Sequence, residues 1–235
     1  MKGLYRIVSS SLLVLFIAFT TIAPAHAQSA KHPDSSGPEW SDLFQSDLSD
    51  AVRPGNVWSM DDGILTATED EVLWTGKVFD DAVIDLDFRN ADATNSGVFV
   101  YASHLIDWVP NSIEIQIADD YHEQWANAPA TWQAGAVFGH VAPSTSAVKA
   151  PGEWNRMTIT CKDELITVVL NGVQVSKMDM SEWTSATENP DGSEIPEWFS
   201  VPKSELPAYG HIGLQGKHGD APIWFRNLRI KELNK

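Results

Sequence analysis

Short runs in which apolar and polar residues alternate recur along the whole chain, and they restrict its fold more than any other feature. In residues 83–89 and 112–118 every second side chain is apolar, which is the period of a β-strand with one buried face. About a dozen such runs follow one another at roughly 10-residue spacing, separated by Gly, Asn, Asp and Pro. Outside residues 1–27, no window of roughly 11 residues has helical periodicity. The pattern predicts an all-β fold.

Turn signals between these runs favour antiparallel pairing. Asn171-Gly172 joins residues 166–170 to residues 173–177, and this dipeptide suits a two-residue hairpin turn that needs positive φ at both positions. Short strands at even spacing predict a two-sheet antiparallel jelly-roll sandwich. Residues 119–134 and 182–209 lack strand periodicity and are long enough to be binding loops or lids. We expect these two long loops to lie over the concave face.

The N-terminus predicts a targeting segment. Lys2 and Arg6 precede an apolar run at residues 12–20, which is too short to span a bilayer, and a small-x-small site ends at Ala27. We therefore expect a signal peptide over residues 1–27, cleaved after Ala27, and a periplasmic or secreted protein. The polar residues 28–38 predict a flexible lead-in, and residues 39–235 are expected to form a single domain.

Charge and cysteine content exclude several classes of function. The chain has 16 Lys and Arg against 32 Asp and Glu, a net charge of −16, which disfavours nucleic acid and anionic membranes as partners. Cys161 is the sole cysteine, so neither an intrachain disulfide nor a cysteine zinc site can form. It falls inside a strand pattern, which favours a buried thiol over a nucleophile.

The strand at residues 112–118 is the first candidate for a functional site. Ile113, Ile115 and Ile117 would face the core, so Glu114 and Gln116 would stand on the opposite face, about 7 Å apart along the strand. A carboxylate beside an amide is suited to acid–base work and to binding hydroxyl groups. The same pattern also fits a solvated strand face, and this stretch alone does not decide between the two.

Tryptophans in the long loops are the second candidate. Aromatic rings stack on the apolar faces of sugars, but a tryptophan in a long loop can equally fasten that loop to the core. The residues concerned are Trp125, Trp132, Trp183 and Trp198.

Eight short motifs follow one another in a fixed order over about residues 40–233. They are Asn95-Ser96-Gly97, Glu114-Ile115-Gln116-Ile117-x-Asp119, Gly135-Ala136-Val137-Phe138-Gly139, Pro151-Gly152-Glu153-Trp154-Asn155, Leu170-Asn171-Gly172, Gly213-Leu214-Gln215, His218-Gly219 and Phe225-Arg226-Asn227. In this order they resemble the 3-keto-disaccharide hydrolase domain family, which has a concanavalin A-like jelly roll.

The resemblance implies an enzyme that cleaves glycosides or oligosaccharides already oxidised at C3 by a separate oxidoreductase, and the predicted leader implies its export. A C3 ketone acidifies the C2 proton, so a base can form an enolate, the C1 substituent can leave, and water can add back. Such a reaction needs a base, an acid at the leaving oxygen and donors for the enolate. The resemblance assigns Glu114 and His218 as base and acid, in an order left open. The expected substrate-binding residues are Asn95, Gln116, Asp119, Asp120, Gln215, Lys217, Trp125, Trp132 and Trp198.

Two other functions remain open at this stage. A conventional glycosidase would use two carboxylates, here Glu114 with Asp119 or Asp120. A lectin-like domain would bind sugar without catalysis, because this type of fold hosts both. No cofactor is expected to be required. A divalent cation has only weak candidate ligands, His122 and Asp120, because no H-E-x-x-H spacing is present.

Overall fold

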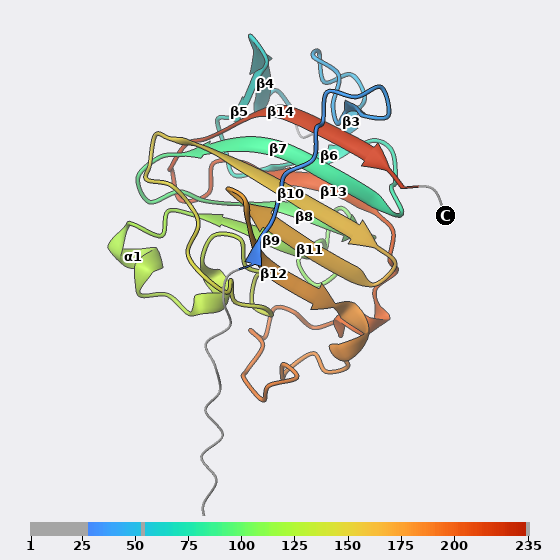
Figure 1. The fold of residues 1–235 in the computed structure, drawn as a ribbon, viewed down its shortest axis with the longest axis vertical. Helices are drawn as coiled ribbons and strands as arrows, with labels where there is room; N and C mark the ends of the chain where they lie inside the picture. The colour runs from blue at the N-terminus through green and yellow to red at the C-terminus, as the bar shows by residue number, and fades with distance from the viewer. Residues whose placement is uncertain (1–27, 53–54, 234–235) are drawn as a thin grey trace, which may run out of the picture.

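The structure is a computed structural model that describes residues 28–52 and 55–233. Two antiparallel β-sheets pack face to face, as Figure 1 shows with the larger sheet in front. The larger sheet has nine strands in the order β1–β12–β11–β10–β7–β14–β5–β4, with β2 paired to β14, and the smaller has five in the order β3–β6–β13–β8–β9. The predicted all-β, two-sheet antiparallel sandwich is confirmed.

The strand bounds follow the sheets. The nine-stranded sheet contains β1 (Gln28–Ser29), β12 (Val173–Asp179), β11 (Leu165–Leu170), β10 (Trp154–Lys162), β7 (Ala82–Asn90), β14 (Ile223–Glu232), β5 (Ile64–Ala67), β4 (Trp58–Asp61) and β2 (Ser41–Asp42). The five-stranded sheet contains β3 (Ala51–Val52), β6 (Val72–Thr75), β13 (His211–Gln215), β8 (Asn95–Ala102) and β9 (Ile113–Ala118). Helical structure in the described residues is limited to α1 (Glu123–Ala126), η1 (Ala130–Trp132), η2 (Met180–Glu182) and η3 (Lys203–Glu205).

The core lies between the sheets, and period-two alternation fills it as predicted. Ile113, Ile115 and Ile117 of β9 are each at most 1% exposed. The β11–β12 hairpin turns at Asn171 and Gly172, with φ of 49° and 84°. Cys161 is buried, as its strand pattern predicted.

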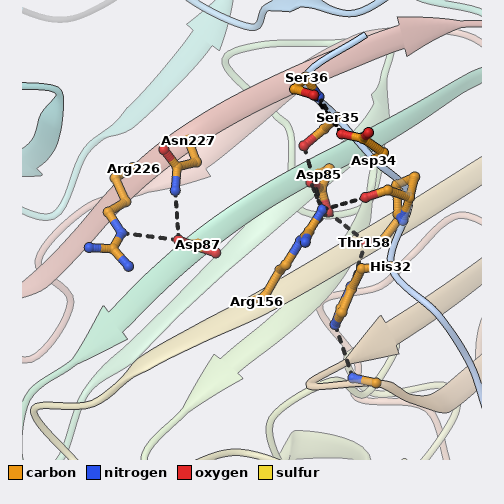
Figure 2. A network of polar contacts seen from close by, with 12 residues as sticks. His32, Asp34, Ser35, Ser36, Asp85, Asp87, Arg156, Thr158, Arg226 and Asn227 are labelled. Carbon is orange, nitrogen blue, oxygen red and sulfur yellow. Dashed lines mark hydrogen bonds and ion pairs between the residues drawn. The ribbon is translucent and has the colours of Figure 1, made fainter.

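The lead-in at residues 28–38 differs from the expectation of flexibility. Figure 1 shows this blue segment crossing the outer face of the nine-stranded sheet, where β1 pairs with β12. His32 contacts the hydroxyl of Thr158 at 2.8 Å and accepts from the Gly172 amide at 2.9 Å. Arg156 donates to the Pro33 carbonyl at 2.6 Å (Figure 2). Polar composition predicted a free segment, but the strand face beneath it supplies matching polar partners.

The polar network in Figure 2 is built around the buried carboxylate of Asp85. This carboxylate accepts from the Arg156 guanidinium at 2.7 Å and from the Thr158 hydroxyl at 2.7 Å. Asp87, two residues on, accepts from Arg226 and Asn227 of β14. Alternating carboxylates on β7 therefore join the lead-in and the last strand across one sheet face.

The two long loops contain short helical turns. Residues 119–134 contain α1 and η1, and residues 182–209 contain η3. The glycine-flanked segment at 135–139 forms no named strand and pairs through single bridges of Val137 with Ile115 and Val141. No helix in residues 28–52 and 55–233 has the length and apolarity to cross a membrane. The predicted signal peptide lies outside the described residues.

Candidate functional site

Strand register gathers most of the polar candidates on the outer face of the five-stranded sheet. Residues directly opposite each other in antiparallel pairs carry their side chains on the same face. Gly213 lies opposite both Trp74 and Phe99, and Phe99 lies opposite Glu114. Phe138 extends this row beyond β9, because its amide donates to the Glu114 carbonyl at 2.9 Å. Glu114 therefore stands between two aromatic side chains.

The neighbouring row on this face is polar. Gln116 lies opposite Gly97, and Gln215 lies opposite Val72. The Gln116 amide donates to the Asn95 side-chain oxygen at 3.0 Å, while its own Oε1 is buried with no hydrogen-bond partner among the described residues. A buried acceptor without a partner is rare in native proteins. It is therefore positioned to accept a hydrogen bond from a bound hydroxyl.

His218 joins this face through Asn95 and Asp70. A β-bridge pairs His218 with Asn95, and His218 Nδ1 lies 2.5 Å from Asp70 Oδ2. The Gln215 amide lies 3.5 Å from the other oxygen of Asp70. Asp70 was not predicted from sequence, where it is one of three consecutive acidic residues, and only the pairing of β6 with β13 brings it to His218. The resulting contact fixes one ring nitrogen and leaves Nε2 for a ligand.

The Glu114 carboxyl lies against the backbone of the adjacent strand. A Cβ built on Gly97 would stand 2.4 Å from Glu114 Oε1, so glycine is needed there to admit the carboxyl group. Burial, followed by the charge of Asp70, raises the pKa of Glu114 to about 8, and Lys203 acts in the opposite direction. Glu114 therefore holds a proton in neutral solution.

A cavity of about 580 Å³ opens beside His218, Gln215 and Asp70, and Glu114 is not among its lining residues. Its lining joins His218, Gln215 and Asp70 to an aromatic and aliphatic wall, and consists of Val52, Asp70, Glu71, Val72, Trp74, Leu105, Ile106, Trp108, Gln215 and His218. The rings of Trp74, Phe99 and Trp108 pack at centroid distances of 4.4–6.3 Å. Trp74 and Trp108 were not predicted as site residues from the sequence, because the apolar residues around each of them are equally typical of a hydrophobic core.

The three tryptophans expected to bind substrate take different positions. Trp125 is buried, and its indole donates to the Ala93 carbonyl at 3.0 Å, so it fastens its loop. Trp132 and Trp198 lie 6.0 Å apart, and Trp132 lies 5.4 Å from Phe138. These two rings therefore lie beyond Phe138, on the side of Glu114 away from the Trp74 wall.

The structure does not bring Asp119 to the polar face. Asp119 is two residues after Ile117, so it lies on the same side of the chain as the buried isoleucines, and it is itself buried. Its carboxylate oxygens accept hydrogen bonds from the amides of Ala93 and Tyr121. Asp120 accepts from the Ala134 amide at 2.9 Å, and burial raises its pKa to about 6. Both carboxylates are used to hold the loop that follows β9.

His122 and Lys217 also lie apart from the polar row. His122 caps α1, where its side chain accepts from the Gln124 amide, and no group of three His, Cys, Asp or Glu suited to a metal ion occurs within residues 28–52 and 55–233. Lys217 Nζ lies 3.6 Å from Asp220 and does not line the cavity.

The fold is a two-sheet β-sandwich of the jelly-roll type. A protein of Bacillus subtilis with a galectin-like fold matches at 13% identity and a TM-score of 0.52, over 82% of this chain and 94% of that one, which shows the fold alone. The model of the 3-keto-alpha-glucoside-1,2-lyase-like domain matches residues 39–231, and the chain belongs to that family.

Two solved structures from Parabacteroides distasonis ATCC 8503, both provisionally named glycosyl hydrolases, are similar to this chain. One has 51% identity and a TM-score of 0.81, over 83% of this chain and 99% of that chain. The other has 21% identity and a TM-score of 0.68, over 83% and 94%. No curated protein matches the chain. Family and relatives together support a hydrolase-type role in carbohydrate chemistry.

Proposed function

We propose that this protein hydrolyses the glycosidic bond of 3-keto-glycosides by elimination and hydration. The observation that carries the proposal is the contact of His218 with Asp70 on the same sheet face as Glu114, whose pKa is raised to about 8. An acid and a base on one sheet face near a cavity are what such a reaction requires. Family membership supports the same chemistry.

His218 is suited to remove the C2 proton. Asp70 holds Nδ1, so Nε2 is the nitrogen that faces substrate, as in other sites where a carboxylate orients a histidine base. The electron pair of the C2–H bond forms the enolate, and the C1–O bond then breaks. Glu114 gives its proton to the departing oxygen. Water next adds at C1 while Glu114 takes a proton from it, and His218 returns a proton to C2.

The neighbouring amides are suited to bind the sugar. Gln116 Oε1 lacks a partner among the described residues, and Asn95 and Gln215 flank it and His218. Amide donors aimed at an enolate oxygen stabilise the charge that develops there. The wall of Trp74 and Trp108 supplies aromatic surface for the remainder of the glycoside. A separate oxidoreductase would supply the 3-keto substrate, outside the cytoplasm if the predicted leader directs export.

The test is incubation with matched native and 3-oxidised disaccharides in D₂O. We expect sugar release from the oxidised substrate alone, with deuterium at C2 of the released 3-keto sugar above a no-enzyme control. Release with hydrogen retained at C2 would contradict elimination and favour direct displacement at C1. Binding of native sugar without release from either substrate would indicate a lectin-like domain.

A further inference from the structure

The ammonium group of Lys203 is buried next to the candidate site. Lys203 begins η3 in the second long loop and is 1% exposed. Its Nζ donates to the carbonyls of Pro110 at 3.2 Å and Ser112 at 3.1 Å, and lies 4.7 Å from the centre of the Phe199 ring. In the described part of the chain no carboxylate oxygen lies within 4 Å of it.

Two contacts place this ammonium near Glu114. The Ser112 carbonyl that accepts from Lys203 is two residues before Glu114, roughly 7 Å along the strand. The Phe199 ring beneath the ammonium packs edge-on against Phe138 at 5.8 Å, and Phe138 is the residue paired beside Glu114. Lys203 therefore reaches the site from the second long loop, on the Phe138 side of Glu114.

Holding the loop in place does not by itself explain why a chargeable side chain is buried at position 203. A buried ammonium loses its hydration, and a neutral donor could bind the same carbonyls at a lower cost. Burial lowers the pKa of Lys203 to about 7, and the charge of Glu114 acts to raise it. The other titratable groups nearby are Asp70 and His218, across Glu114, and His140, whose pKa burial lowers to about 4. Lys203 is thus the group that opposes Asp70 at Glu114.

We propose that Lys203 is a positioning residue whose ammonium is the counter-charge for Glu114 once that side chain has given up its proton. The inference rests on the proposed function, in which the proton moves from Glu114 to the departing glycosidic oxygen. The carboxylate that remains lies between apolar rings and within the field of Asp70, so a positive charge on Lys203 favours the transfer, and the ionised Glu114 in turn favours that charge.

The direct test measures the pKa of the Glu114 carboxyl group by NMR of protein labelled with ¹³C-glutamate, with Glu114→Gln identifying its signal. Lys203→Met should raise this pKa by about one unit, because the opposing charge is lost. Lys203→Arg keeps the charge and should leave the value close to that of the wild type. Lys162→Met, which removes an exposed lysine of β10, is the matched control and should have no effect. An unchanged Glu114 pKa in folded Lys203→Met overturns the proposal.

The electrostatic coupling between Glu114 and Lys203 can also be measured at Lys203. If Lys203→Met does not fold, Glu114→Gln should lower the pKa of the Lys203 ammonium, followed by NMR of ¹⁵N-lysine, because coupling between two sites is reciprocal. An unchanged Lys203 pKa would contradict the proposal in the same way. Neither measurement uses substrate, so failure of sugar release would refute the proposed function without affecting this test.

Activity measurements distinguish an electrostatic role of Lys203 from a purely structural role in holding its loop in place. With 3-keto substrate, Lys203→Met should lower kcat and move the alkaline limb of the kcat/KM profile to higher pH, and Lys203→Arg should restore the limb. If Lys203 only holds its loop in place, Lys203→Met lowers Tm and does not shift the alkaline limb of the kcat/KM profile.

Discussion

The role of a single residue in this protein depends on its neighbours in the adjacent strand. Gly97 shows this clearly, since the absence of its side chain admits the Glu114 carboxyl and so produces the burial that raises its pKa. The sequence predicted the orientation of Glu114 from alternation alone. It did not predict the role of Gly97, because a glycine in a strand has several explanations until its neighbour is known.

Asp70 provides the first residue-scale prediction. Asp70→Asn keeps the shape of the side chain but removes the charge that holds His218, so kcat with 3-keto substrate should fall by roughly 10-fold or more. The pKa of Glu114 should fall as well, because Asp70 raises it, and the alkaline limb of activity should move to lower pH.

Glu69→Gln is the control for Asp70→Asn, because it removes an adjacent carboxylate that does not line the cavity. The pH profile of kcat/KM is the measurement for both variants. A profile and a kcat equal to those of the wild type in Asp70→Asn would show that Asp70 does not act through His218.

At the scale of elements, alternation predicted the long strands but not their neighbours. The edge strands β1, β2 and β3 have two residues each, too few for a period to be read. The site needs the register of β6, β8, β9 and β13, whose residues are far apart in the sequence. Local patterns select which face a side chain occupies, whereas register decides which side chains meet. This explains why alternation placed Glu114 and Gln116 on one face, whereas it gave no indication of Asp70; Asn95 was expected from the family resemblance.

The residues 103–112, between β8 and β9, supply a prediction about binding. Trp108 packs on Phe99 at 4.4 Å and lines the cavity, so Trp108→Ala should remove stacking surface and raise KM by roughly 5-fold or more with a smaller change in kcat. Trp154→Ala is the matched control, since this ring stacks on Arg89 and Arg226 of the other sheet. Steady-state kinetics with 3-keto substrate check it. A loss confined to kcat would place Trp108 outside substrate binding.

At the scale of the whole molecule, the site should lower stability in a defined pH range. The pKa of Glu114 is raised from 4.5 to about 8 on folding, so the folded state binds this proton more tightly than the unfolded state. The free energy of unfolding therefore decreases as pH rises from about 4.5 to about 8. Glu114→Gln removes this dependence without changing the shape of the side chain.

We expect the Tm of Glu114→Gln to exceed that of the wild type by a margin that grows between pH 4.5 and pH 8. Thermal unfolding across this range measures it, and His140 contributes equally to both proteins. A constant margin would mean that the proton affinity of Glu114 does not change on folding. Such a gain in stability with a loss of activity is common at functional sites.

The last strand of the chain lies inside the nine-stranded sheet rather than at its edge. β14 pairs with β7 on one side and with β5 and β2 on the other, and Figure 1 shows it crossing the molecule in red. A nascent chain that lacks residues 223–232 leaves the hydrogen-bonding edges of β7 and β5 open, which favours misassembly. The complete nine-stranded sheet can therefore form only once residues 223–232 have been synthesised.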